Sequence, residues 1–327
     1  MILTLLCFNK TYAVENDVKI IKNFEKDGIC YVVFNDEESK AYVTFKSDGY
    51  NGEIIIPESV LFDDIEYYIK GILPNAFKES RNLRSIDIKC NIKVIGNYSF
   101  FECDKLERVK LPSSVEFIGN CAFYGCYKLK EINLSEGLKG ISDYCFEDCY
   151  SLTHVDLYDS LINLGQYSFY NCYSLKNISI PNGISEIKVG TFQNCVNLEN
   201  VQLGSNIETI GEKGFYNCNS LSNVGFPNSL LRIGDKAFSR CYNINNIVFP
   251  YNIDYIGWDA FEYCNFLDEI RFLNDIPPKI GETAFYISRK FKDKKVKVLV
   301  PENTHKNYRY KMFFKFGKAE YEVSEYL

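Results

Sequence analysis

Thirteen cysteines and two histidines are the side chains in this sequence that could bind a metal ion, form disulfide bonds or take part in catalysis. Zinc sites use cysteine or histidine pairs that are about two to four residues apart. The pairs Cys121/Cys126 and Cys145/Cys149 come nearest to this spacing. Three of these four cysteines, however, occupy positions that recur along the chain. We therefore expect neither a metal site nor any other cofactor.

Motifs for catalysis are missing from the sequence. His154 is expected at an outward strand position and His305 near the C-terminus, and no nucleophile elbow, phosphate-binding loop or metalloprotease motif accompanies them. The net charge is −6, and no basic stripe is present that would favour nucleic acid as a partner. No apolar run approaches the roughly 18 to 20 residues that cross a bilayer. We predict that the protein is not an enzyme.

A repeat of 23 residues accounts for most of the cysteines. Phenylalanine recurs at this interval from Phe77 to Phe285, with a single step of 24 at the end, and cysteine follows three residues later in eight copies. A Leu or Ile comes next, then two aliphatic residues in alternate positions, and the unit closes with Ile-Gly. The expected core residues are Phe100, Phe123, Phe146, Phe169, Phe192, Phe215, Phe238, Phe261, Cys103, Cys126, Cys149, Cys172, Cys195, Cys218, Cys241 and Cys264.

The spacing within one unit predicts one coil of a solenoid. The alternating aliphatic residues are typical of a strand with one buried face. Proline ends this strand, and glycine after Ile permits a tight bend. One coil cannot bury its apolar side alone, but stacked coils cover one another. Cysteine then serves as a small apolar residue. Neighbouring strands lie about 4.8 Å apart, whereas disulfides prefer Cβ atoms about 3.8 Å apart, so we expect reduced, buried thiols.

The segment IGNCAFYGCYKLKEINL and its copies resemble the BspA-like, or Treponema-type, class of leucine-rich repeats. The resemblance covers about residues 50–300. It implies a repeat solenoid of about nine to ten coils, with a parallel β-sheet on the concave face. It also implies a surface or secreted protein that acts in adhesion and in host or matrix binding.

The ends of the chain depart from the repeat. Residues 1–13 resemble a short or truncated signal segment, although a buried first strand is the alternative. Residues 14–56 are expected to form a β-rich N-terminal cap, because a solenoid must cover its open end. The solenoid is expected over residues 57–300, and its first unit carries a nine-residue hairpin insertion whose tip is Asp63-Asp64. A C-terminal cap is expected over residues 301–327.

The outward side chains of the strands form the predicted binding surface. Its middle is uncharged and rich in amides, which provide both donors and acceptors for a protein or glycan ligand. The candidate residues are His154, Asn177, Asn200, Gln202, Asn223 and Asn246. Asparagine ladders that only stabilise the stack are the alternative, and the tyrosine-bearing turns, with Tyr127 and Tyr150, are the competing surface.

These features leave two function classes open. The first is an adhesin-like binding protein, at the cell surface or secreted, that recognises a protein or glycan such as a host or matrix component. It is expected to be monomeric and without a transmembrane span. The second is an intracellular leucine-rich repeat scaffold in the cytoplasm. The sequence names neither the ligand nor the means of anchoring.

Overall fold

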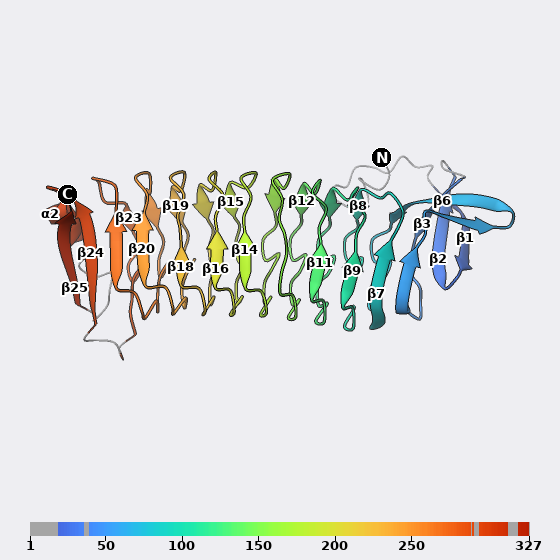
Figure 1. Ribbon diagram of the computed structural model, residues 1–327, viewed down its shortest axis with the longest axis horizontal. Helices are drawn as coiled ribbons and strands as arrows, with labels where there is room; N and C mark the ends of the chain where they lie inside the picture. Colours follow the sequence, from blue (N-terminus) through green and yellow to red (C-terminus); the bar gives the residue numbers. More distant parts are fainter. Residues whose placement is uncertain (1–18, 36–38, 289, 291–293, 313–319, 327) are drawn as a thin grey trace. The chain divides into compact units, whose positions relative to one another are not determined.

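The computed structural model describes residues 19–35, 39–288, 290, 294–312 and 320–326. The chain divides into two compact units, Met1–Ser168 and Phe169–Leu327. Each unit contains a series of coils, most of them 23 residues long, that pair through short parallel strands (Figure 1). This confirms the predicted β-solenoid. The possible signal segment, residues 1–13, lies outside the described residues.

The first unit begins with antiparallel strands and continues with parallel ones. Its strands are β1 (Ile20–Lys26), β2 (Ile29–Phe34), β3 (Lys40–Val43), β4 (Asn51–Ile56), β5 (Ser59–Phe62), β6 (Ile65–Ile72), β7 (Asn82–Ile88), β8 (Val94–Ile95), β9 (Arg108–Lys110), β10 (Phe117–Ile118), β11 (Glu131–Asn133), β12 (Gly140–Ile141) and β13 (Asn163–Leu164). β1, β2 and β3 pair antiparallel within the predicted cap. β4, also within residues 14–56, pairs parallel with β7 of the first coil.

The predicted insertion is a hairpin, as β5 pairs antiparallel with β6. Phe62 and Ile65 face each other across the turn, so Asp63 and Asp64 form its tip, and both have positive φ angles. Acidic side chains tolerate this left-handed backbone better than most residues. The tip expected from the sequence is therefore confirmed.

The second unit is built from coils of the same kind. Its elements are β14 (Asn177–Ser179), β15 (Glu186–Ile187), β16 (Asn200–Gln202), β17 (Thr209–Ile210), β18 (Asn223–Val224), β19 (Arg232–Ile233), β20 (Asn246–Phe249), β21 (Tyr255–Ile256), β22 (Glu269–Phe272), β23 (Lys279–Ile280), β24 (Lys295–Pro301), α2 (His305–Met312) and β25 (Glu320–Tyr326). Parallel β25 extends the sheet of β20, β22 and β24. Within the predicted C-terminal cap, residues 313–319 and 327 lie outside the described residues.

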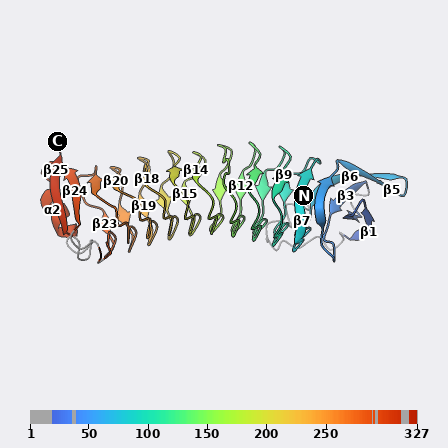
Figure 2. The same cartoon turned by 60° about the horizontal axis from the view of Figure 1, so that its bottom comes forward.

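Each coil contributes strands to two ladders. The strands that contain the alternating aliphatic residues form the first ladder. It consists of β4, β7, β9 and β11 in the first unit, and of two separate sheets in the second, β14-β16-β18 and β20-β22-β24-β25. The strands before Ile-Gly form the second ladder, which runs from β6 to β13 in the first unit and from β15 to β23 in the second. Within a unit, successive coils repeat the same path (Figure 2). We call the outward side of the first ladder the strand face.

Phenylalanine rings stack face to face at the centre of each unit. Ring centroids of Phe77 and Phe100 lie 5.0 Å apart, and those of Phe192 and Phe215 lie 5.3 Å apart, with nearly parallel planes. Tyr50 caps the stack of the first unit, 4.4 Å from Phe77. The predicted core phenylalanines are all buried, so the spine inferred from the 23-residue interval is confirmed.

The cysteine column has a role beyond that of a small apolar residue. The Cys103 thiol lies 3.1 Å from the Phe77 carbonyl oxygen of the preceding coil and donates a hydrogen bond to it. The same contact recurs at 3.2 Å from Cys126 to Phe100 and at 3.1 Å from Cys241 to Phe215. The column thus links neighbouring coils, and the interpretation of cysteine as an apolar filler was incomplete.

No disulfide joins the cysteines in the described ranges, and the eight core cysteines are buried. Burial raises the pKa of the Cys126, Cys149 and Cys195 thiols, so the reactive thiolate is scarce. We expect a thiol reagent to modify few core cysteines in the native protein and all of them after denaturation, as counted by mass spectrometry. Disulfides joining most of the eight would contradict this.

The glycines after Ile do not serve the tight bend that the sequence suggested. Gly119 and Gly234 lack a positive φ angle. A Cβ atom on Gly119 would lie 2.7 Å from the backbone nitrogen of Asn97, and one on Gly234 would lie 2.7 Å from that of Glu212. Glycine is needed because the backbones of neighbouring coils touch there.

The bends that need a left-handed backbone lie elsewhere, two residues before and two residues after each repeat phenylalanine from Phe77 to Phe261. Positive φ angles occur at Tyr144 and Asp148 around Phe146, and the same holds around other copies. Asn171, Asn194 and Asn217 occupy the later position, in keeping with the tolerance of asparagine for this conformation. The turns thus depend on residues that the sequence pattern did not single out.

Candidate binding surface

Five of the six predicted site residues lie in the second unit. Asn177, Asn200 and Asn223 are directly opposite one another on β14, β16 and β18. Gln202 follows on β16, opposite Ser179. Because the strands are parallel and in register, the 23-residue repeat places chemically equivalent side chains in one row.

The amides of this row are exposed, as are Gln202 and Asn246. The Asn200 Nδ2 donates to the Asn177 Oδ1 at 2.8 Å, and the Ser179 hydroxyl donates to the Gln202 Oε1 at 3.5 Å. Asn246 starts β20, which belongs to a different sheet from β18, and its Nδ2 donates to Asn245 Oδ1 at 3.2 Å. The hydrogen bond between Asn200 and Asn177 uses one donor and one acceptor of the row. Each amide therefore retains further donor or acceptor positions for a ligand.

His154 belongs to the first unit. It forms an isolated parallel bridge with Glu131, and its Nε2 lies 2.9 Å from the Asp156 carboxylate on the same segment. The structure therefore places His154 beside acidic groups. The amide row of Asn177, Asn200 and Asn223 is confined to the second unit.

Two outward positions that were not among the candidate binding residues also lie on the strand face of the second unit. Val248, on β20, has 47% of its surface exposed. A Cβ atom on Gly225 would meet no atom within 4 Å, so the backbone is open to a ligand there. Both occur at the second outward position of their strands, where most copies are polar, and this change of residue type is the signal that could have found them.

The competing surface is formed by tyrosines on the turns. Tyr127 and Tyr150 stack with ring centroids 5.0 Å apart, and Tyr144 stacks on Tyr167 at 5.2 Å. Burial and the neighbouring Glu147 raise the pKa of Tyr124 to about 12. These rings lie in the first unit and form rows of the same periodic kind as the asparagines.

Glu147 is a titrating group on these turns. Burial, with the nearby Asp148 charge, raises its pKa to about 7. The folded state therefore binds the proton of the Glu147 carboxyl more tightly than the unfolded state does. Protonation of Glu147 thus favours folding, and this contribution is complete at low pH and is lost as pH rises towards 7. We expect Glu147→Gln to raise the melting temperature at pH 8 and to leave it unchanged at pH 4.

The control is Glu199→Gln, at an exposed position in the second unit. Its effect on the melting temperature should be the same at both pH values. Thermal unfolding followed by circular dichroism checks both variants. An effect of Glu147→Gln that is equal at pH 4 and pH 8 would contradict the assigned burial.

No group of three or more His, Cys, Asp or Glu side chains that could hold a metal ion occurs among the residues that the structure describes. In the same part of the chain, no helix is long and apolar enough to cross a membrane. The two described histidines each face an acidic side chain, as His305 Nδ1 lies 2.8 Å from Glu325.

Comparison with known proteins gives the same fold. A leucine-rich repeat protein from Bacteroides ovatus aligns with a TM-score of 0.62 and 23% identity, covering 92% of this chain and 99% of that one. The leucine-rich repeat protein of T. pallidum aligns with a TM-score of 0.54 and 25% identity, covering 62% of this chain and 92% of that one. None of the curated proteins matches the chain.

The family assignment comes from the sequence of the repeats themselves. The family model described as the BspA type leucine rich repeat region matches residues 70–192 and 162–292, with six copies. These ranges cover more than half of the chain and include the phenylalanine and cysteine columns described above. The chain belongs to the BspA-type leucine-rich repeat family.

Proposed function

We propose that the chain is an exported, adhesin-like binding protein that holds a partner protein against the strand face of its second unit, without catalysis. The observation that carries this proposal is the exposed, uncharged row of Asn177, Asn200 and Asn223. Repeat proteins of this family are typically surface or secreted proteins, and their fold is generally a binding scaffold.

The chemistry of the row suits a protein partner. Protein interfaces combine a small apolar centre with a polar rim. Exposed Val248 and the open backbone at Gly225 supply apolar contact area beside the amides. Amides can bond to a partner's backbone, since each offers a donor and an acceptor.

A pair of double variants tests the surface. Asn200→Asp with Asn223→Asp places two like charges side by side on the strand face and should weaken binding to immobilised extracellular proteins by about tenfold or more. Asn206→Asp with Asn228→Asp adds the same charge at other exposed sites of the unit and should leave binding unchanged.

Both variants should melt close to the parent protein, because the altered side chains are exposed and each double variant removes a single side-chain hydrogen bond, from Asn200 or from Asn206. Binding that survives the strand-face change but falls when Tyr127 and Tyr150 become serine would move the site to the turns and defeat the proposal.

Export has a separate test. The mass of the native protein should correspond to a chain that starts at Val14 and is recovered outside the cell. An intact Met1 in the soluble cell fraction would instead support the intracellular scaffold.

A further inference from the structure

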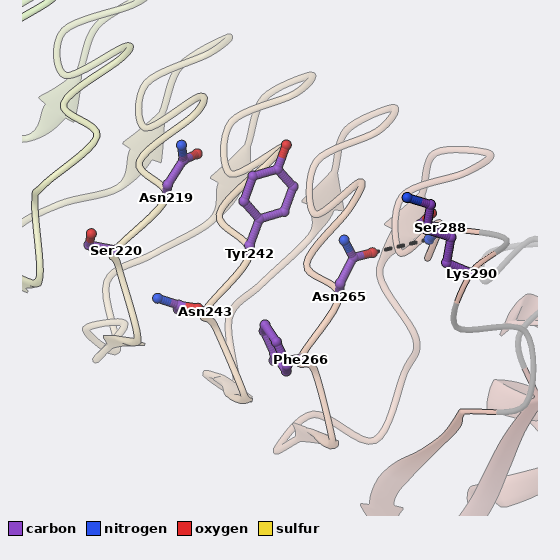
Figure 3. A pocket seen from close by; sticks show the side chains of 8 residues that line it. All are labelled: Asn219, Ser220, Tyr242, Asn243, Asn265, Phe266, Ser288 and Lys290. Carbon is purple, nitrogen blue, oxygen red and sulfur yellow. Dashed lines mark hydrogen bonds between the residues drawn. The ribbon is translucent and has the colours of Figure 1, made fainter.

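A groove with a volume of about 690 Å³ lies on the turns that follow the cysteine column in the second unit. Three consecutive coils build it (Figure 3), and each contributes the two residues after its cysteine. The residues are Asn219 and Ser220, Tyr242 and Asn243, and Asn265 and Phe266, while Ser288 and Lys290 line one end. The groove is separate from the strand face, which is formed by the residues further along each coil.

The groove contains polar groups that the protein does not satisfy. The Asn219 Oδ1 is buried and has no hydrogen-bond donor within the described residues. The Asn243 amide and the Ser220 hydroxyl, which also line the groove, make no side-chain hydrogen bond to any part of the chain that the structure describes. By contrast, the Asn265 Oδ1 accepts from the Ser288 backbone N–H at 3.1 Å, which fixes that amide with its Nδ2 still able to donate.

Aromatic surface lies beside these polar groups. Phe266 is 52% exposed although it is a large apolar residue. Its backbone N–H donates to the Tyr242 carbonyl at 3.2 Å, which places the two aromatic residues on adjacent turns. Figure 3 shows Phe266 next to Asn243 and Asn265. An exposed ring between amides provides a flat apolar face next to donors and acceptors.

The corresponding turn after Cys103, in the first unit, has a different character. There the residues after Cys103 are Asp104 and Lys105. Arg81 approaches Asp104 at 3.9 Å and Glu102 at 3.2 Å, so charges on those turns are paired with one another. The groove of the second unit is lined by uncharged side chains except for Lys290. The repeat alone therefore does not require its amide and aromatic composition.

We propose that this groove binds a neutral oligosaccharide. Sugar hydroxyls can donate to amide oxygens such as the Asn243 Oδ1 and accept from amide nitrogens such as the Asn265 Nδ2, while the C–H face of a pyranose ring packs on an exposed aromatic ring. A polyanion is disfavoured because a single cationic side chain lines the groove. An extended peptide is disfavoured because the groove walls are turns rather than a strand edge to which a peptide could add.

The test uses the whole chain and a panel of neutral hexasaccharides with different linkages, measured by saturation-transfer NMR and titration calorimetry. Phe266→Ala and Asn243→Ala change exposed side chains and should each weaken binding of the hexasaccharide that binds best by about tenfold or more. The matched controls are Phe45→Ala, also at an exposed phenylalanine, and Asn200→Ala on the strand face. Both should leave sugar affinity unchanged.

The result is independent of the function proposed above, because Asn200→Asp with Asn223→Asp should not affect sugar binding. Absence of binding for every hexasaccharide at millimolar concentration would overturn the proposal, as would sugar binding that is unaffected by Phe266→Ala. Selection of peptides, but not sugars, whose binding is lost in Phe266→Ala would assign the groove to a peptide instead.

Discussion

Replacing Phe215 with alanine should reduce the free energy of unfolding by about 3–5 kcal/mol, through lost burial and the cavity left behind. The Phe215 ring is fully buried, between Phe192 at 5.3 Å and Phe238 at 5.2 Å. Stacked coils leave little room for collapse, because each ring is held between two others. Chemical denaturation followed by circular dichroism measures the loss.

Two comparisons make this result specific to the stack. Phe285→Ala, in the last copy of the repeat, should cost less, because a terminal repeat has repeat neighbours on one side only. Phe45→Ala removes a ring that is 51% exposed and should cost under about 1 kcal/mol. Equal losses at Phe215 and Phe45 would show that the spine does not support the fold.

Gly234→Ala should destabilise the protein by about 3 kcal/mol, although it adds a single methyl group. The new Cβ atom would lie 2.7 Å from the Glu212 backbone nitrogen and 2.8 Å from the Gly211 carbonyl carbon. Both atoms belong to the main chain of the preceding coil, so relief requires the coils to move apart. The melting temperature of the purified variant checks this expectation.

Gly225→Ala is the matched control within the same coil. No atom lies within 4 Å of its added Cβ, and its φ angle is not left-handed. Alanine there restricts the unfolded chain and should stabilise the protein by up to about 1 kcal/mol. If the two variants change stability in the same direction and by the same amount, close backbone approach is not the reason for glycine at position 234.

The coil and its core were predictable because the residues that recur every 23 positions are the buried ones. Phe123, Cys126 and Leu129 recur at one interval, and only a stack of identical coils places such residues in columns. The turn after Pro112 was also predictable, and the Val115 N–H indeed donates to the Pro112 carbonyl at 3.3 Å. Local spacing was sufficient in both cases.

Contacts between coils were not predictable from one unit of the pattern. The hydrogen bond from the Cys126 thiol to the Phe100 carbonyl depends on the distance between coils, and so does the close backbone approach at Gly119. In the sequence, both residues are simply small. Left-handed backbone at Tyr144 and Tyr167 was missed because tyrosine gives no signal for it.

Of the candidate surfaces, one was predictable from the sequence and the other was not. The row of Asn177, Asn200 and Asn223 followed from the register of equivalent positions, and the structure places these side chains opposite one another. The groove around Asn219 and Phe266 did not follow, because its residues differ from coil to coil. A hollow between turns depends on the sizes of neighbouring side chains rather than on their period.

The constant offsets of the coil have a consequence for how such a gene can change. The hydrogen bonds donated by the cysteine thiols join residues 26 positions apart, whereas the hydrogen bond between stacked asparagine amides joins residues 23 positions apart. Duplication or deletion of one complete coil preserves all of these offsets, so the length of the protein can vary by recombination without a new core. The 24-residue step from Ile256 to Ile280 shows where smaller insertions survive. Phe249 and Phe272 remain 23 apart, so the extra residue lies in the turn after β22, outside both ladders.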